Sequence, residues 1–174
     1  MPVIRKLDYF TEGKSENIPK ITHSELVNRA EAWLRGKGYR VTAKELHTSN
    51  SETPDVMGFG YGGDSCLIEC KTSRPDFFAD KNKSFRRDSQ NGMGQHRYYA
   101  VPVGLVKPEE LPDGLGLLNV YEKIGGFRSI RKAKDSLMFD ADKHAEVNFL
   151  VSILRRLRIS TAVFIERVEK EKRE

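Results

Sequence analysis

Two acidic residues and a lysine have the types and spacing of a metal-dependent hydrolytic site. Asp55 follows a proline, Glu69 comes 14 residues later, and Lys71 lies two residues beyond it. Alternation along a strand would put Glu69 and Lys71 on one face, about 7 Å apart. Ile68 and Cys70 would then point the other way, into apolar packing. Because burying either charge without a partner is costly, two charged residues in an otherwise apolar strand need an explanation.

The glycine-rich segment between these residues predicts a hairpin that brings Asp55 close to Glu69. The extended runs 54–59 and 65–72 flank residues 60–64, which include three glycines. Opposite residues on antiparallel strands approach within about 5 Å. Two converging carboxylates repel each other unless a cation lies between them. Such oxygen ligands suit Mg²⁺, for which Mn²⁺ can substitute, and the backbone carbonyl of Cys70 could add another oxygen.

Apolar periodicity predicts the elements that would position these residues. A helix capped by Thr22 or Ser24 should end at Gly36, with strands over 39–46, 97–103 and 115–121. A second helix is expected over 75–87, and 128–134 is interpreted as a loop or strand end. A C-terminal helical region over about 142–172 should pack one face, formed by Val147, Leu150, Val151, Leu154 and Leu157. The sum is an α/β domain with a mixed central β-sheet flanked by helices.

The composition of the chain indicates a globular protein without a membrane helix. The chain has 174 residues, 32% of them charged, and a net charge of +5, which is typical of a globular domain that could meet phosphates. The first 20 residues resemble no signal peptide, and no stretch reaches the roughly 18 apolar residues of a membrane helix. We therefore expect a cytoplasmic protein that contacts no membrane. Cys66 and Cys70 would lie about 13 Å apart on one strand, so free thiols are expected.

The motif Pro54-Asp55, the glycine-rich gap and Glu69-Cys70-Lys71 resemble the PD-(D/E)XK nuclease superfamily over residues 22–103. Residues 69–73, followed by Asp76-Phe77 and Asp80-Lys81, are similar to small phage-encoded or bacterial members associated with DNA repair or processing. The resemblance implies a restriction-endonuclease-like core with the order αβββαβ. It also implies a single nuclease-like domain over 21–174, preceded by an irregular arm over 1–20, with a C-terminal helical region over about 142–174.

The resemblance further implies a role for each motif residue. Asp55 and Glu69 would hold Mg²⁺ together with Cys70, and Lys71 would orient or help deprotonate the attacking water. An acidic residue of the first helix would join them, either Glu25 or the alternative Glu31. The implied activity is endo- or exonucleolytic hydrolysis of phosphodiester bonds in DNA, with RNA not excluded.

Basic and aromatic residues downstream of the motif could grip phosphates and stack bases. The alternative is a solvated basic helix face above core phenylalanines. The basic run 155–158 indicates a solvated amphipathic helix, with a phosphate contact or a homodimer contact as alternatives. The predicted nucleic-acid-binding residues are Arg74, Lys81, Lys83, Arg86, Arg87, Gln95, His96 and Arg97.

Several interpretations of function stay open. The first is the metal-dependent nuclease, and the second is a catalytically silent nucleic-acid-binding module with the same fold. A third is a protein-interaction domain that uses its basic helices against an acidic partner. The simplest structural alternative is a surface salt bridge between Glu69 and Lys71, with Asp55 serving only as a turn residue.

Overall fold

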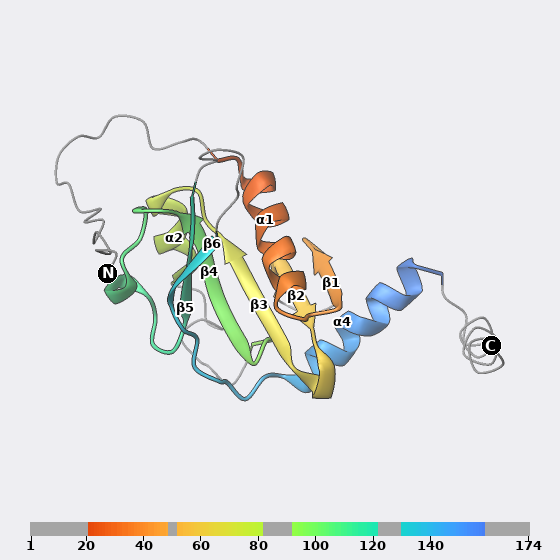
Figure 1. Ribbon diagram of the computed structural model, residues 1–174. Helices are drawn as coiled ribbons and strands as arrows, with labels where there is room; N and C mark the ends of the chain where they lie inside the picture. Colours follow the sequence, from red (N-terminus) through yellow and green to blue (C-terminus); the bar gives the residue numbers. More distant parts are fainter. Residues whose placement is uncertain (1–20, 49–51, 82–91, 122–129, 159–174) are drawn as a thin grey trace, which may run out of the picture.

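A six-stranded mixed β-sheet forms the centre of the protein (Figure 1). The computed structural model describes residues 21–48, 52–81, 92–121 and 130–158. The arm expected over 1–20 and the helical region expected beyond 158 lie outside these residues. The strands follow chain order across the sheet: β1 (Val41–Lys44), β2 (Val56–Phe59), β3 (Ser65–Cys70), β4 (His96–Pro102), β5 (Gly116–Val120) and β6 (Ile130–Lys134).

The pairing of the strands makes the sheet mixed. Strands β1, β2 and β3 form an antiparallel meander, with a short 3-10 turn (Tyr61–Gly63) between β2 and β3. Strands β3, β4 and β5 run parallel, and β6 returns antiparallel to β5. The predicted mixed α/β architecture is therefore confirmed. Residues 128–134, interpreted as a loop or strand end, include the edge strand β6.

Helix α1 (His23–Gly36) covers one face of the sheet. Thr22 caps it, since its hydroxyl accepts a hydrogen bond from the Glu25 N–H at 3.2 Å. The helix ends where Gly38 adopts a left-handed φ of 95°. Its apolar stripe packs on the side chains of alternate strand residues, among them Ile68 and Cys70, which belong to the same buried cluster. The buried free thiols confirm the prediction for the two cysteines.

Helices α2 (Arg74–Lys81) and α4 (Lys143–Arg156) cover the opposite face. Phe77 of α2 packs with Tyr99, and Phe149 of α4 packs with Leu67. Side chains alternate along β3, so Glu69 shares this face with Leu67, whereas Ile68 and Cys70 face α1. The sequence prediction for the two sides of β3 is thus confirmed.

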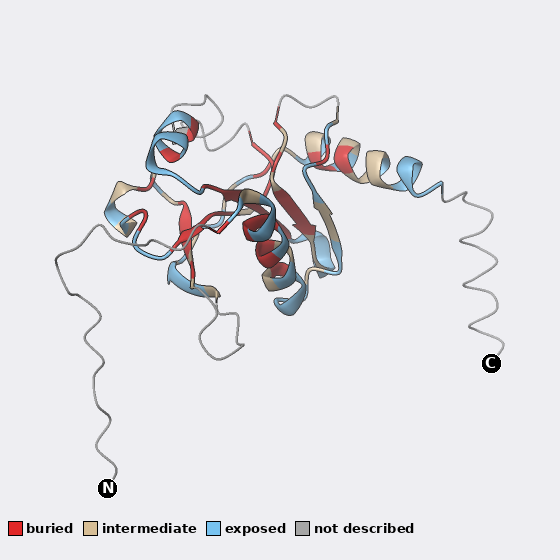
Figure 2. Cartoon of the chain, turned by 90° about the horizontal axis from the view of Figure 1, so that it is seen from above, coloured by how far each residue is buried: buried red, intermediate tan, exposed pale blue. Residues whose placement is uncertain are grey.

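The packing face predicted for α4 is wrong. Its buried residues are Glu146 and Phe149, with Ala145 and Ile153 packed beside Phe149. In Figure 2, α4 is the helix that leads to the C-terminus, and its last turns are exposed. The helix has apolar residues on two sides, and periodicity cannot tell which side meets the sheet. Exposed members of the predicted face are Val147, Val151, Leu154 and Leu157.

Some expected boundaries differ from the structure. The first strand, expected over 39–46, spans only Val41–Lys44, and α2 is described from Arg74 to Lys81, where the described stretch ends. Within the described ranges, no helix combines the length and apolar character that a membrane crossing needs.

Candidate metal-binding site

Three acidic residues lie in a row at one end of three neighbouring strands. The antiparallel register of β2 and β3 puts Asp55, the residue before β2, opposite Glu69. On the other side, the Glu45 N–H donates to the Asp55 carbonyl oxygen at 3.0 Å. The hairpin register that puts Asp55 opposite Glu69 is the predicted one, whereas Glu45 is an addition from the end of β1.

The two carboxylate oxygens of Asp55 have different neighbours. Oδ2 accepts a hydrogen bond from the Cys70 N–H at 2.7 Å. Oδ1 lies 3.5 Å from Nε2 of His23, and the same nitrogen lies 3.3 Å from Oε1 of Glu45. One donor atom from each of His23, Glu45 and Asp55 lies within 4.8 Å of the others, an arrangement that could hold a metal ion.

The backbone carbonyl of Cys70 is also directed toward this end of β2. The N–H and C=O of one strand residue point to the same side, and the Cys70 N–H points to Asp55. Continued by one position, the register of β2 and β3 puts Pro54 opposite Cys70. Proline has no N–H, so it cannot donate a hydrogen bond to the Cys70 carbonyl. The thiol lies on the other face, where burial raises its pKa, and the charges of Asp55 and Glu69 raise it further. Only the carbonyl of Cys70 therefore fits the role of a metal donor.

Lys71 lies between two buried carboxylates. Its Nζ is 3.3 Å from Oε2 of Glu69 and 3.4 Å from Oδ1 of Asp80, on helix α2. The side chains of all three residues are at least 92% buried. Burial acts to lower the pKa of the Lys71 ammonium, but the charges of Glu69, Asp80 and Asp55 outweigh it and raise that pKa. The neighbouring carboxylates therefore favour the charged form of Lys71.

Asp80 is in turn held by the sheet. Its Oδ2 accepts a hydrogen bond from the Tyr99 hydroxyl at 2.8 Å. Tyr99 is the register partner of Glu69 on β4, and its ring packs edge-on against Phe77, with centroids 5.0 Å apart. Helix α2 thus fixes the Lys71 ammonium through Asp80, a residue that the sequence analysis did not assign to the site. The sequence contains one indication of this role: Asp80 comes three residues after the apolar Phe77, and that spacing puts both residues on one side of a helix.

The first helix brings a histidine, and not its predicted acidic residue, to Asp55. Glu25 forms an ion pair with Arg29, and Arg29 donates to the Tyr121 carbonyl at 2.9 Å. Glu31 is the alternative, and its Oε2 lies 3.1 Å from Nζ of Lys44. It is eight residues after His23, which is about 12 Å along the helix. His23 reaches Asp55 because it is the first residue of α1.

The predicted nucleic-acid contacts divide into four groups, of which Gln95 and His96 form the last. Arg74 bonds with Glu110 and donates to the Leu105 carbonyl at 2.9 Å. Arg97 is 1% exposed and donates to the carbonyls of Gly94 and Gly92 at 2.9 and 2.7 Å. This burial contradicts a phosphate-binding role for Arg97, which instead holds the segment before β4. Outside the described part lie the Lys81 side chain and all of Lys83, Arg86 and Arg87.

Gln95 and His96 lie at the other end of the sheet from Lys71. His96 pairs with Cys66 near the start of β3, three residues and about 10 Å from Glu69. The side chain of Cys66 faces α1, and paired residues of neighbouring strands point to the same face of a sheet. His96 is therefore directed away from the face that carries Glu69. The structure therefore does not bring these two residues to the acidic row.

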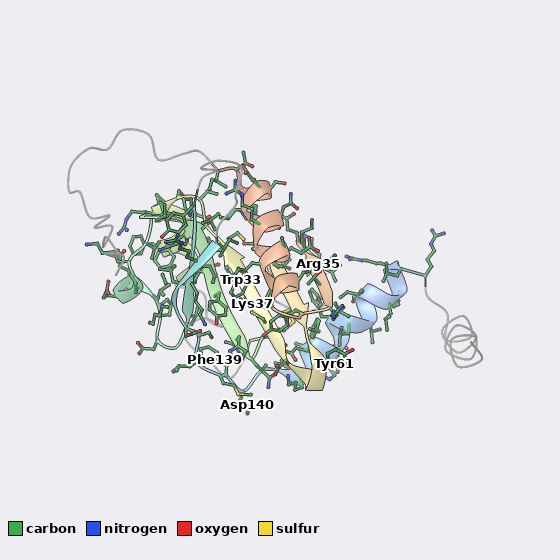
Figure 3. The ribbon with its side chains drawn as sticks, viewed as in Figure 1. Trp33, Arg35, Lys37, Tyr61, Phe139 and Asp140 are labelled. Atoms are coloured by element: carbon green, nitrogen blue, oxygen red, sulfur yellow. The ribbon has the colours of Figure 1, made fainter. Side chains whose placement is uncertain are left out.

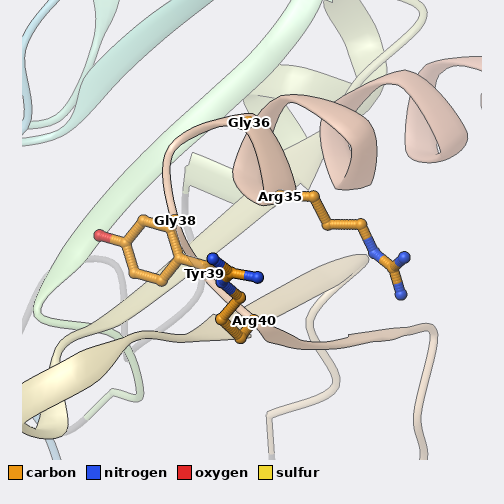
Figure 4. A pocket seen from close by; sticks show the side chains of 5 residues that line it. All are labelled: Arg35, Gly36, Gly38, Tyr39 and Arg40. Atoms are coloured by element: carbon orange, nitrogen blue, oxygen red, sulfur yellow. The ribbon is translucent and has the colours of Figure 1, made fainter.

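A basic hollow lies at the far end of α1 (Figure 4). Tyr39 and Arg40 line it together with Arg35 and the glycines Gly36 and Gly38. Since α1 begins beside Asp55 and ends at this hollow, most of the helix length separates the two places. The hollow is thus not part of the candidate metal site.

Comparisons with known proteins establish a likeness of fold. No family model and no curated protein matches the sequence. A solved structure of a protein of unknown function from Silicibacter pomeroyi is 25% identical, with a TM-score of 0.57. The match covers 80% of this chain and 92% of that one. The chain is therefore similar in fold to that protein of unknown function.

Proposed function

We propose that this protein is a metal-dependent nuclease that hydrolyses phosphodiester bonds of DNA. The observation that carries the proposal is the register that puts Asp55 opposite Glu69 on paired strands, with the buried Lys71 beside Glu69. Two further findings support it. The first six elements outside the 3-10 turns have the order α1-β1-β2-β3-α2-β4, which is the order of a restriction-endonuclease-like core. The two strands of the motif are also joined as a tight antiparallel pair, as the PD-(D/E)XK resemblance implies.

The donor set suits a divalent cation such as Mg²⁺ or Mn²⁺. Asp55 offers Oδ1 beside His23 and Glu45, and the Cys70 carbonyl points to the same end of β2. Glu69, opposite Asp55 on β3, would add its carboxylate. Oxygen donors with room for waters are the environment that Mg²⁺ prefers, while the neighbouring His23 nitrogen would favour Mn²⁺. When bound, such a cation would activate a water molecule and neutralise charge on a phosphate.

Lys71 would act on the phosphate as a cation. Its raised pKa keeps the ammonium charged, so it would stabilise negative charge that builds on the phosphoryl oxygens. Asp80 and Tyr99 keep that ammonium close to Glu69. A base role for Lys71 would require a proton loss that its three carboxylate neighbours oppose.

The test is a cleavage panel of duplex, single-stranded and branched DNA and of RNA, with Mg²⁺ or Mn²⁺. The wild type should cut at least one DNA substrate, and chelation should stop the reaction. Lys71→Ala should be slower by about 10²–10³-fold, since it removes one charge-stabilising donor. Arg40→Ala, which changes an exposed residue beyond the far end of α1, should cut at the wild-type rate.

A catalytically silent nucleic-acid-binding module is the second candidate. The pairing of Glu25 with Arg29 favours it, because the helix acid implied by the resemblance is engaged elsewhere. That reading predicts salt-sensitive DNA binding without cleavage under any metal. Equal cleavage by the wild type and by Lys71→Ala would contradict the proposed assignment of the site.

A further inference from the structure

An imidazole nitrogen lies between two carboxylate oxygens at the start of α1. Nε2 of His23 is 3.3 Å from Oε1 of Glu45 and 3.5 Å from Oδ1 of Asp55. Charge-assisted hydrogen bonds between nitrogen and oxygen are shorter, about 2.7–2.9 Å. The two separations are thus longer than those of a closed hydrogen-bonded pair, and they leave the three donor atoms grouped around a common point.

The spacing of these donors matches the coordination sphere of a four-coordinate metal ion. Ligands arranged as a tetrahedron around Zn²⁺, each about 2.1 Å from the ion, lie about 3.4 Å from one another. Neighbouring ligands of octahedral Mg²⁺, also about 2.1 Å from the ion, lie only about 2.9 Å apart. The observed 3.3 and 3.5 Å therefore fit a tetrahedral transition ion better than Mg²⁺.

The types of donor favour the same class of ion. Imidazole nitrogen suits zinc and other first-row transition ions, whereas Mg²⁺ takes oxygen ligands and keeps several of its waters. Two carboxylates also balance the charge of one divalent ion. The side chains of His23 and Glu45 are 41% and 57% exposed, so a water molecule can complete the coordination.

The fold brings the three donors together from different elements. His23 is the first residue of α1, and the N–H of Glu45, just after β1, donates to the Asp55 carbonyl at 3.0 Å. A backbone N–H of β3 binds Oδ2 of Asp55, so Oδ1 is the oxygen that faces the imidazole. Figure 3 labels Arg35 near the other end of α1, 12 residues after His23. At about 18 Å along the helix, the cations of that end are screened from the carboxylates.

We propose that His23, Glu45 and Asp55 bind one transition-metal ion, Zn²⁺ or Mn²⁺, in preference to Mg²⁺. His23 sets the preference because it supplies the nitrogen donor, and Glu45 adds a ligand that lies outside the sequence motif. Affinities of such nitrogen and oxygen sites rise from Mn²⁺ to Zn²⁺. The inference rests on the proposed function for the use of this ion in hydrolysis, whereas binding of the ion can be measured without a substrate.

Calorimetric titration of the full chain with each of the three ions tests the proposal. The wild type should bind Mn²⁺ at least about tenfold more tightly than Mg²⁺, and Zn²⁺ more tightly still. His23→Gln should lose at least about tenfold in Zn²⁺ affinity but change its Mg²⁺ affinity less than about threefold. Glu45→Gln should weaken the binding of both Zn²⁺ and Mn²⁺. The matched controls, His144→Gln and Glu109→Gln at exposed residues of other elements, should bind as the wild type does.

Nuclear magnetic resonance of the histidine nitrogens identifies the ligand directly. Zn²⁺ should shift the Nε2 signal of one histidine, and His23→Gln should lack that signal while circular dichroism shows a folded chain. A wild type that binds Zn²⁺ no more tightly than Mg²⁺ would overturn the proposal, as would a His23→Gln variant that keeps the preference. Failure of the nuclease function would look different, because the expected ion preference would then be present without cleavage of any DNA.

Discussion

The two ends of strand β3 both bury charged groups, yet they are built differently. At its start, Glu146 of α4 accepts hydrogen bonds from the Ser65 hydroxyl at 2.5 Å and from the Gly94 N–H at 2.9 Å. At its end, Glu69 lies beside Asp55, and Lys71 lies between Glu69 and another carboxylate. A hydroxyl, a backbone N–H and the Lys143 ammonium donate to the first carboxylate, whereas the second shares one buried lysine with Asp80 and lies opposite Asp55. Three carboxylates around one lysine leave an excess of negative charge, and such an excess suits an external cation.

The largest expected difference between the two ends is in catalysis. Glu69→Gln should lower the cleavage rate by roughly 10³-fold, because it removes one metal donor and with it several kcal/mol of transition-state stabilisation. Circular dichroism should still show a folded chain, since glutamine fills the same space. Single-turnover cleavage with Mn²⁺ measures the effect. A rate within a factor of about three of the wild type would show that Glu69 has no catalytic part.

At the start of β3 the expected loss is in stability. Arg97→Ala leaves the carbonyls of Gly92 and Gly94 without their donor and opens space beside Phe139, whose ring lies 4.6 Å from the guanidinium. The free energy of unfolding should fall by about 3 kcal/mol. Urea denaturation measures it, with Arg40→Ala as the exposed control. An unchanged midpoint would contradict the structural role given to Arg97.

A smaller effect should separate Asp80 from a neighbour on the same helix. Asp80→Asn removes one of the two anions that hold Lys71, so kcat should fall about tenfold with little change in KM. Asp76→Asn, at an exposed residue one turn earlier, is the matched control and should have a much weaker effect. Steady-state kinetics at saturating Mn²⁺ distinguish the two. An equal loss in both variants would mean that Asp80 does not position Lys71.

The smallest effect concerns an exposed ion pair outside both ends of β3. Hydrogen bonding to Arg74 lowers the pKa of Glu110 from 4.5 to about 2. Because the folded-state pKa is the lower one, the pair stabilises the fold above pH 4.5 and loses this effect as the pH falls toward about 2. Glu110→Gln should therefore unfold with a slightly shallower acid dependence, measured by denaturation between these pH values. An identical pH dependence would assign the pair no role in stability.

Sequence reasoning succeeded where the physics is local. The alternation that puts Ile68 and Cys70 on one face and Glu69 on the other depends only on strand geometry, and the glycine-rich turn set the hairpin that pairs Asp55 with Glu69. Both follow from short-range rules that a single sequence contains.

Features that depend on long-range packing could not be predicted from the sequence. Arg97 has the residue type of a phosphate ligand, but the carbonyls that bind it come from a loop fold that no spacing predicts. His23 reaches Asp55 only through the placement of α1 on the sheet. The outer face of α4 was mistaken for its packing face because the helix has two apolar sides and only the tertiary structure selects Phe149.

Calorimetric titration with Mn²⁺ tests the central claim most directly, since it needs no knowledge of the substrate. The wild type should bind the ion, and Asp55→Asn should bind it at least about tenfold more weakly. Glu146→Gln, a matched change of a buried carboxylate at the other end of β3, should bind as the wild type does. Absence of binding by the wild type, or equal binding by all three proteins, would contradict a metal site at the acidic end of the sheet.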